Sequence, residues 1–334
     1  MRKSTGRHLA TSPKTMITSL VLAVLLAAGA TSAALLLNVH TSQASDCTSQ
    51  PPYVGVALKH PNATAVSQFS AATGVAPNTV EVYRKFGSRF PRPLVQTFTQ
   101  RHALTLIQIN PRKPVKLAQI VAGKYDRELQ AYAIAVRKFH CPVAISFGHE
   151  MNGNWYPWSF GCVSPRVFKA AWRHIHDVFT AEHATNVIWV WTINRKVAMS
   201  GNRKITESGN CNNAKFHAVA SPARWWWPGG KYVNWIGIDG YYSQHKATFD
   251  NLFDAQLAQV RFTHKPVLIT ETAIPNNWRA ASKIRKIRGL FKGVNAPRML
   301  GFVWFDIDKK HPWRINTDQV APEAFHSGAS EYGF

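Results

Sequence analysis

The chain has 334 residues, 46% of them apolar and 12% aromatic, and 40 Lys and Arg against 17 Asp and Glu produce a net charge of +23. This composition excludes a wholly disordered chain and supplies the apolar side chains for one large core, as in barrels of about 250 residues. The basic residues are dispersed and no nucleic-acid motif accompanies them, so the charge indicates a solvated surface or an anionic cell-surface polymer, and no nucleic acid.

The first 45 residues differ in composition from the remainder. A basic start is followed by residues 16–38, which are apolar and carry no charge. This pattern predicts an export segment that is long enough to span a bilayer. Ser42-Gln43-Ala44 is a candidate cleavage site, so a cleaved signal and an uncleaved anchor both stay open. In either case we expect residues 46–334 to be exported, secreted or anchored at the outer face of the cell membrane.

Eight short β-rich apolar runs follow, and segments of helical period separate them. Several runs are apolar at consecutive positions, which is typical of strands buried on both faces of a parallel sheet. The runs are YVGVAL (53–58), VEVYRKF (80–86), LTLIQI (104–109), VAISFG (143–148), VIWVWTI (187–193), WIGIDGY (235–241), VLITE (267–271) and GFVWFD (301–306).

The segments between the runs carry helix start signals. Asp126 is a candidate N-cap, and Ser164 followed by Pro165 predicts an N-cap and a first helical residue. Eight strands alternating with helices predict an α/β fold, a single (β/α)₈ barrel domain over residues 46–334. An open doubly wound sheet is the alternative, but no glycine-rich phosphate loop follows the first run.

The barrel topology assigns the four cysteines to its two ends. Cys47 and Cys141 precede strands, whereas Cys162 and Cys211 follow strands and belong to the opposite end. An exported chain can form disulfides, and we therefore expect the pairs Cys47–Cys141 and Cys162–Cys211. No C-x-x-C pair is present, which disfavours zinc or redox chemistry.

Two glutamates close apolar runs at the end where barrels place their chemistry. The fourth run leads into His149-Glu150, within ISFGHEMNGNWYPW, and the seventh ends at Glu271. Charged residues are rarely buried without a partner or a task, and the chain has few carboxylates to spare. Two such carboxyls suit hydrolysis of a glycosidic bond. The structural alternative for Glu271 is a salt bridge to Lys265 or Arg279.

The aromatic residues indicate the ligand class. Sugar rings pack on aromatic faces while their hydroxyls need polar partners. Aromatic and amide side chains follow Glu150 in close succession: Asn152, Asn154, Trp155, Tyr156 and Trp158. A zinc motif H-E-x-x-H would need a histidine where Gly153 stands, so no metal is expected, and no organic cofactor is implied.

Four segments, HEMNGNWYPW, WIGIDGYY, KPVLITETA and GFVWFDID, together resemble glycoside hydrolase family 26, the β-mannanase family of retaining (β/α)₈ barrels. The resemblance extends over roughly residues 52–315. It implies that Glu150 is the proton donor and acid/base and that Glu271 is the nucleophile of a double displacement. The two carboxyls of a retaining enzyme lie about 5–5.5 Å apart, against roughly 6.5–9.5 Å in an inverting one.

The resemblance also assigns neighbours of the two acids to sugar binding. His149 matches the histidine that orients the acid/base and contacts the sugar, Trp155 matches an aromatic of the cleft, and Trp304 matches the platform beneath the sugar. Tyr241 matches the tyrosine that hydrogen-bonds the nucleophile, with the adjacent Tyr242 as the alternative. Further candidates for substrate binding are Asn152 and Tyr156.

One segment departs from the family pattern. Members often carry Trp-Glu-Pro at the end of the third strand, where this chain has Ile109-Asn110-Pro111. The change removes an aromatic and an acid from the cleft wall, so the polysaccharide stays open while the catalytic pair is intact.

The leading interpretation is an exported endo-β-1,4-mannanase that acts on a mannan-type polysaccharide. Within the same family, a β-1,3-xylanase and a mixed-linkage β-glucanase stay open, because the strand ends do not encode the orientation of the sugar hydroxyls. From a different class, the alternative is a non-catalytic basic barrel that binds a polysaccharide or a cell wall.

Overall fold

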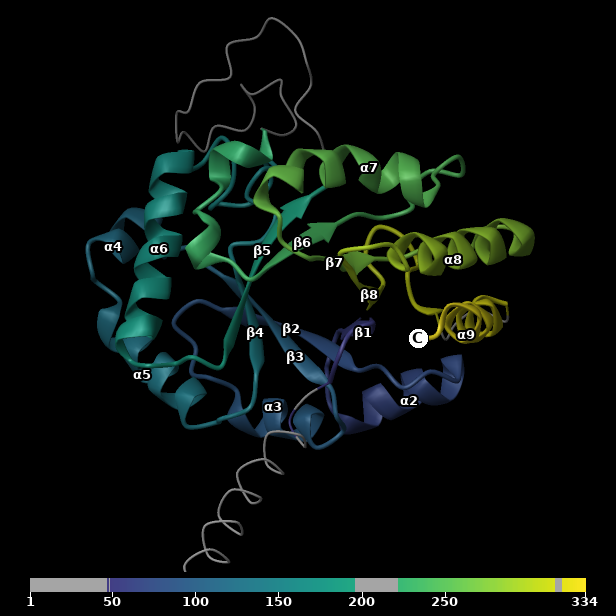
Figure 1. Ribbon diagram of the computed structural model, residues 1–334, viewed down its shortest axis with the longest axis horizontal. Helices are drawn as coiled ribbons and strands as arrows, with labels where there is room; N and C mark the ends of the chain where they lie inside the picture. The colour runs from purple at the N-terminus through teal and green to yellow at the C-terminus, as the bar shows by residue number, and fades with distance from the viewer. Residues whose placement is uncertain (1–46, 48, 196–221, 316–319) are drawn as a thin grey trace, which may run out of the picture. The chain divides into compact units, whose positions relative to one another are not determined.

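The computed structural model describes residues 47, 49–195, 222–315 and 320–334. In this part of the chain eight parallel strands close into a barrel in the order β1 to β8, and helices alternate with them around its outside (Figure 1). The (β/α)₈ fold expected from the sequence is confirmed. The predicted export segment, residues 16–38, lies outside the described residues. Within the described ranges, no helix combines the length and the apolar character that crossing a bilayer requires.

Each predicted run coincides with a strand to within two residues. The strands are β1 (Tyr53–Leu58), β2 (Thr79–Lys85), β3 (Leu104–Asn110), β4 (Val143–Phe147), β5 (Val187–Asn194), β6 (Trp235–Asp239), β7 (Val267–Thr272) and β8 (Met299–Asp306). The helices are α2 (Ala63–Thr73), α3 (Arg92–Thr99), α4 (Leu117–Val121), α5 (Asp126–Arg137), α6 (Pro165–Ala181), α7 (Phe249–Val260), α8 (Ala280–Val294) and α9 (Ala321–Tyr332). Short 3₁₀ turns are η2 (Ala223–Trp226), η3 (Gly230–Tyr232) and η4 (Arg261–Thr263).

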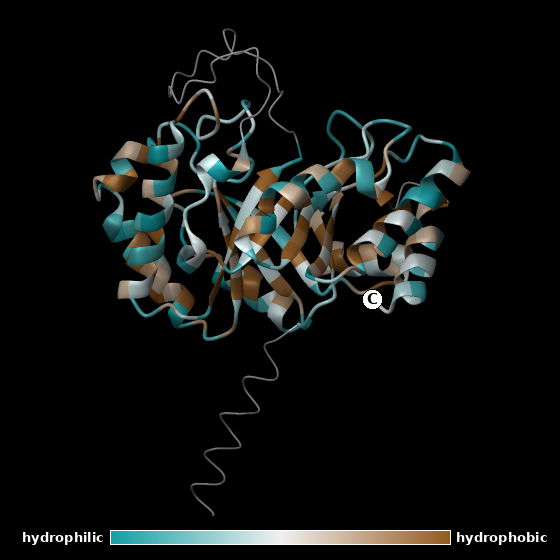
Figure 2. Ribbon diagram, turned by 45° about the horizontal axis from the view of Figure 1, so that its top comes forward, coloured by the Kyte–Doolittle hydropathy of each residue, from teal (hydrophilic) through white to brown (hydrophobic). Residues whose placement is uncertain are grey.

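The core lies between the strands and the inner faces of the helices, where apolar residues gather (Figure 2). On β4, Phe147 packs on Phe168 and Trp172 of α6, with ring centroids 6.1 and 6.4 Å apart. On β8, Phe302 packs on Phe325 of α9 at 5.8 Å. These outward-facing rings remove apolar surface from water and hold the strand ends in place.

Polar side chains inside the barrel bond across adjacent strands. Each bond satisfies a buried group that would otherwise be unpaired at a cost of about 1–3 kcal/mol. The three bonds are Gln108 to Glu81 at 2.7 Å, Ser146 to Thr192 at 3.0 Å, and Thr270 to Asp239 at 2.6 Å. A polar interior therefore supports the end of the barrel at which the strands finish.

One helix start agrees with the sequence and one does not. The Ser164 side chain accepts a bond from the backbone N–H of Val167, as an N-cap does. The predicted cap at Asp126 is wrong, because Tyr125 occupies the N-cap position and Asp126 is the first helical residue. The Asp126 carboxylate instead lies 2.6 Å from Nε2 of His174 on α6, so its tertiary partner replaces the local cap.

The expected Cys47–Cys141 disulfide is confirmed, with Cα atoms 5.3 Å apart. It joins the segment before β1 to the segment before β4, at the end of the barrel where strands begin. Cys211 lies outside the described residues, so the second expected pair, Cys162–Cys211, stays a prediction.

Candidate active site

Glu150 and Glu271 both lie at the mouth formed by the carboxyl ends of the strands. Glu271 belongs to β7, and Glu150 follows β4 by three residues. Both side chains are buried, with 6% and 5% of their surface exposed. The negative charge of Glu271 raises the pKa of Glu150, so the two carboxyls lie within electrostatic reach of each other.

Two tyrosine hydroxyls hold Glu271. Tyr83 of β2 donates to Oε1 at 2.6 Å, and Tyr241, two residues beyond β6, donates to Oε2. Burial raises the pKa of Glu271, and both hydroxyls oppose this rise because they hydrogen-bond the charged form. Tyr241 rather than Tyr242 is thus the tyrosine on this carboxylate. Neither Lys265 nor Arg279 forms an ion pair with it in the described part of the chain.

Glu150 has a different set of partners. Asn194, the last residue of β5, donates from Nδ2 to Oε1 at 2.5 Å, and Trp155 donates from Nε1 to Oε2 at 2.6 Å. Glu150 has a φ of +56°, an uncommon value for a residue with a side chain, in the turn that directs its carboxyl to these donors. Burial, followed by the charge of Glu271, raises its pKa to about 7. A group of this kind can give up and take back a proton near neutral pH.

Two further buried acids surround the pair, and sequence reasoning did not assign them a role. Burial and the charge of Glu271 raise the pKa of Glu81 and of Asp239 well above their usual values. Oε2 of Glu81 and Oδ2 of Asp239 have no hydrogen-bond partner within the described residues. The Glu271 charge raises the pKa of the three neighbouring carboxyls, so a second negative charge beside it is disfavoured.

His149 is a buried neutral imidazole between aromatic rings. Burial, and then the positive charges of Lys309 and Arg112, lower its pKa to about 3. Its Nε2 lies 3.3 Å from the Tyr156 hydroxyl, and its ring lies edge-on to that of Tyr83 at 6.1 Å. The structure thus places His149 and Tyr156 beside the glutamates, and their contact with a sugar stays a prediction.

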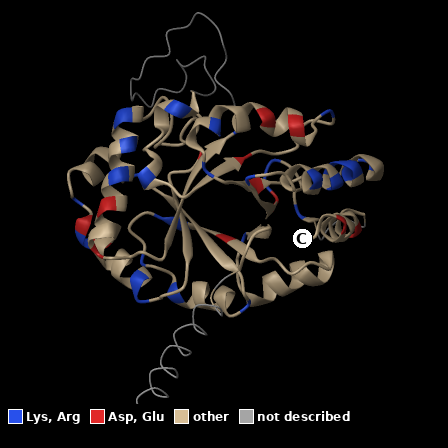
Figure 3. Ribbon diagram, viewed as in Figure 1, with Lys and Arg blue, Asp and Glu red and all other residues tan. Residues whose placement is uncertain are grey.

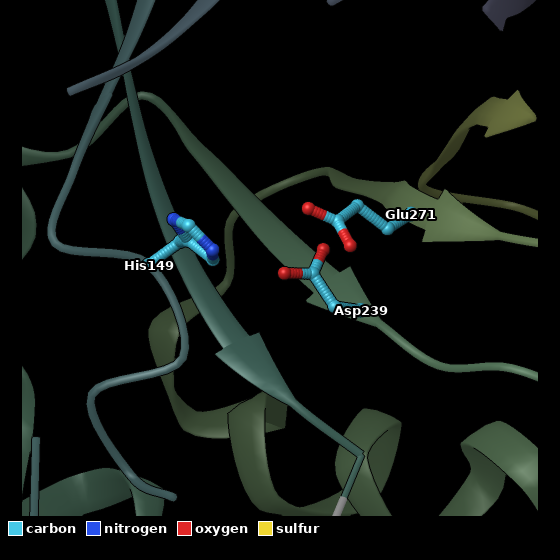
Figure 4. Close-up of side chains that lie close together, drawn as sticks. All are labelled: His149, Asp239 and Glu271. Atoms are coloured by element: carbon cyan, nitrogen blue, oxygen red, sulfur yellow. The ribbon is translucent and has the colours of Figure 1, made fainter. Parts of the chain in front are cut away.

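His149, Asp239 and Glu271 form a compact cluster. One potential ligand atom from each lies within 4.8 Å of the others, and Figure 4 shows both carboxyls turned toward the imidazole. Such a set could hold a transition metal. However, Glu271 already accepts two hydroxyl donors and burial favours the neutral form of Asp239, and both conditions weaken the carboxyls as ligands for a cation.

The structure corrects the role predicted for Trp304. This side chain is 1% exposed and faces outward, with its ring 5.7 Å from that of Phe325 on α9. The next residue, Phe305, faces the mouth and lies edge-on to Tyr241 at 5.5 Å, while the Trp313 ring lies 5.1 Å from Tyr241. Phe305 and Trp313, and not Trp304, are therefore the aromatic residues beside the tyrosine that holds Glu271.

Asn152 also has a different task from the predicted contact with substrate. It is 1% exposed, donates from Nδ2 to the carbonyl of Asn194 at 3.0 Å and accepts from the Asn194 N–H at 2.8 Å. Both polar atoms of the Asn152 side chain thus bond the Asn194 backbone. Asn152 positions Asn194, which in turn holds Glu150. Trp155 bonds Glu150 directly and is half-buried, which is compatible with the predicted contact with sugar.

Sequence reasoning missed Tyr83 and Asn194, although each bonds a central glutamate. The sequence contained a clue, because side chains alternate in direction along a strand. Tyr83 lies two residues after Glu81, and Asn194 lies two residues after Thr192. Residues two apart on a strand share a face, so these polar pairs mark the inner face of β2 and of β5.

Comparison with known proteins points to one family. Residues 127–277 match the family model described as Glycosyl hydrolase family 26. Endoglucanase H of Acetivibrio thermocellus is 26% identical over 281 residues, which cover 79% of this chain and 29% of that protein. Beta-1,3-xylanase TXYA of a Vibrio species is 20% identical over 196 residues, 57% of this chain and 36% of that protein. The chain thus spans about a third of the length of these two curated relatives.

Solved structures with the same fold include two mannanases. The GH26 β-mannanase of Bacteroides ovatus has a TM-score of 0.59 and 13% identity, and the match covers 85% of this chain and 89% of the other. The catalytic domain of the GH26 endo-β-1,4-mannanase of Bacillus sp. JAMB-750 has a TM-score of 0.60 and 14% identity, with 86% and 88% covered. At these identities the likeness shows a shared fold.

Proposed function

We propose that this chain, which belongs to glycosyl hydrolase family 26, is a retaining endo-β-glycanase that hydrolyses a mannan-type polysaccharide. The observation that carries the proposal is the pair of buried glutamates with opposite surroundings. Two hydroxyls stabilise the charged form of Glu271, whereas the charge of Glu271 and burial favour the neutral form of Glu150. Two carboxyls whose surroundings favour opposite protonation states match the nucleophile and the acid of a retaining glycosidase.

The mechanism assigns each glutamate to one side of the bond. Glu150 donates its proton to the glycosidic oxygen as that bond breaks, while the Glu271 carboxylate attacks the anomeric carbon and forms a glycosyl-enzyme. Glu150, now a carboxylate, removes a proton from water, which displaces Glu271 with retention of configuration. Tyr83 and Tyr241 orient the nucleophile, and Asn194 and Trp155 orient the acid.

Mannan is the first choice of substrate because both structural relatives above are described as β-mannanases. The curated relatives are described as an endoglucanase and a β-1,3-xylanase, which keeps a β-glucan and β-1,3-xylan as the alternatives. The sugar-facing aromatics in the proposal are Trp155, Tyr156 and Trp313.

We also propose that the barrel is exported, with residues 16–38 as signal or anchor. The Cys47–Cys141 disulfide supports this, because disulfides persist in oxidising compartments outside the cytosol.

The test is reducing-sugar release from mannan, β-1,3-xylan and mixed-linkage β-glucan by the wild type and by Glu271→Ala. We expect release from mannan, and the first product to show the anomeric configuration of the substrate by proton NMR. Glu271→Ala should reduce release to background, while the control Glu128→Ala, on the outer face of α5, should retain it. Binding without release from any polymer would instead favour the non-catalytic polysaccharide-binding barrel.

A further inference from the structure

Basic side chains gather along one side of the barrel mouth. Strands β8, β1, β2 and β3 are consecutive neighbours in the barrel. The residues that end or follow them, 307–315, 59–62, 84–91 and 111–116, contain ten Lys and Arg and a single acid, Asp308. We call these ten basic side chains the cationic arc. All of them are exposed except Arg84, which is half-buried.

Three loops on the other side of the mouth carry little charge. The loops after β4, β6 and β7, residues 151–164, 240–248 and 273–279, contain two basic residues, Lys246 and Arg279, and no acid. They supply Trp155 and Tyr241 instead. Many acids of the chain lie on helices outside the barrel, among them α5, α7 and α9 (Figure 3). The loops after β4, β6 and β7 thus carry fewer charges than the cationic arc, while the connection after β5, residues 195–234, contains seven further Lys and Arg.

The arc reaches the catalytic groups from two sides. Lys309 Nζ lies 4.5 Å from the centroid of the Phe305 ring, which in turn packs on Tyr241 at 5.5 Å. Arg112 follows β3, on the side of the mouth where His149 lies, and its charge lowers the pKa of that imidazole. A polymer that crosses the mouth would thus pass cations on either side of the bond to be cleaved.

A hollow of about 340 Å³ lies at the ends of β1 and β2 and is lined in part by Lys59, His60, Arg84 and Tyr83. Tyr83 is the residue that donates to Glu271, so the hollow borders the catalytic centre. Basic side chains thus border this hollow, and an anionic oxygen of a ligand there would have cationic partners.

Three members of the arc have no ion pair in the described part of the chain, namely Lys59, Arg112 and Lys309. The ion pairs found there join His174 to Asp126, His176 to Asp177 and Arg288 to Glu331. Exposed cations without an ion pair among the described residues can interact with an anionic ligand.

We propose that the β-glycan cleaved at this site carries anionic substituents, carboxylate or sulfate groups, which bind to the cationic arc while the sugar rings pack on the aromatic residues of the loops after β4 and β6. This substrate class rests on the proposed function, since it concerns the same groove. An anionic substrate would also explain why basic side chains surround a centre of buried carboxyls. Without those cations, the carboxyls would repel an acidic polymer.

The experiment compares one polymer backbone in three forms: neutral mannan, mannan oxidised at C6 to carboxylates, and sulfated mannan. For the full-length wild type at 20 mM salt, we expect kcat/KM to be about ten-fold higher on at least one anionic form, and to approach that of neutral mannan at 1 M salt, where screening is nearly complete. The two anionic arms decide between carboxylate and sulfate.

The variant Lys59→Gln/Arg112→Gln/Lys309→Gln should lose the preference for the anionic form. The matched control Arg101→Gln/Lys138→Gln/Lys292→Gln removes the same charges from exposed positions near the other end of the barrel and should keep it. The proposal would be overturned if both variants lost the preference for the anionic polymer equally, because the effect would then come from the net charge of the protein. It would also be overturned if the wild type cleaved neutral and anionic polymers at equal rates.

Binding separates the failure of this inference from the failure of the proposed function. Both charge variants are combined with Glu271→Ala, and affinity electrophoresis measures retardation by the same polymers. No release from any polymer together with arc-dependent retardation by the anionic forms would refute the hydrolase and leave the anionic ligand standing. Arc-dependent binding of duplex DNA as tight as that of the anionic glycan would overturn the assignment to a glycan.

Discussion

At the scale of single residues, the site works by giving four carboxyls different surroundings. Glu271 alone receives two hydroxyl donors, whereas Glu81 and Asp239 each leave one oxygen without a partner within the described residues. Burial raises the pKa of all four, and the charge of Glu271 raises the pKa of the other three further. These surroundings favour a negative charge at Glu271 and disfavour ionisation of its three neighbours.

The first prediction concerns the proton on Glu150. Its pKa of about 7 should set the alkaline limb of the kcat/KM profile, because the acid must be protonated to act. Trp155→Phe removes an N–H that lowers this pKa, so the limb should move to higher pH even though the rate falls. Trp227→Phe, a ring that packs on Trp191 at 5.2 Å away from the glutamates, is the control and should leave the limb in place. A limb that stays put in Trp155→Phe would contradict this role of the indole.

The second prediction concerns stability and pH. A carboxyl with a raised folded-state pKa contributes stability that is fully present below its unfolded pKa, and this contribution is lost as pH rises through the folded pKa. The unfolding free energy of the wild type should therefore fall between pH 4 and pH 8. Glu81→Gln has a similar shape but cannot ionise. Its unfolding free energy should therefore increase relative to that of the wild type as pH rises, because a pKa difference of one between the folded and unfolded states corresponds to about 1.4 kcal/mol.

Urea denaturation at pH 4.5 and pH 8 measures this difference. The control Glu128→Gln lies exposed on α5 and should follow the wild type at both pH values. If Glu81→Gln loses as much stability with pH as the wild type does, Glu81 is not the buried acid described above.

At the scale of elements, the strands could be predicted but the direction of their side chains only in part. The apolar runs are distinct because a parallel strand is buried on both faces, and this same property hides which face is the inner one. In GFVWFD every position is buried, so nothing in the apolar pattern separates Trp304 from Phe305. Polar residues two apart, as in Glu81 and Tyr83, mark the inner face where they occur.

The glutamates could be predicted because each follows a strand end, a position that depends only on chain order. Their hydrogen-bond partners could not, because Tyr83 is 188 residues from Glu271 and Asn194 is 44 residues from Glu150. Only closure of the barrel brings such residues together. Likewise the Asp126 cap failed because a helix neighbour, His174, competes for the carboxylate.

The third prediction concerns the disulfide as a link between elements. Cys47–Cys141 joins two segments that are 94 residues apart, so it removes chain entropy from the unfolded state. Cys47→Ser/Cys141→Ser should lower the unfolding free energy by about 2–4 kcal/mol in urea denaturation. Reducing the wild type should have at least this effect. A further loss on reducing the double variant would reveal the expected Cys162–Cys211 pair, and an unchanged stability of the double variant would contradict the structural role.

At the scale of the whole molecule, three kinds of side chain occupy different parts of the barrel. Apolar rings pack outside the strands, polar side chains that bond across strands lie inside the barrel, and the cationic arc borders one side of the mouth. The outer layer provides the rigidity, and the inner layers provide the charge differences on which the proposed reaction depends. Substitutions in the outer layer should therefore act on stability and those at the mouth on rate.

The last prediction concerns the division of the chain at residues 45 and 46. Every strand and every buried core residue of the described chain lies at or after Tyr53, and Cys47–Phe334 forms one compact unit. A chain of residues 46–334 should therefore keep kcat/KM on the polymer and melt within about 2 °C of the full chain in the same detergent buffer, since a difference of 1 kcal/mol shifts Tm by about 2–4 °C in domains of 150–250 residues. Differential scanning calorimetry would measure one cooperative transition in both. A barrel that melts much lower without residues 1–45 would show that they contribute to its fold and would move the predicted boundary.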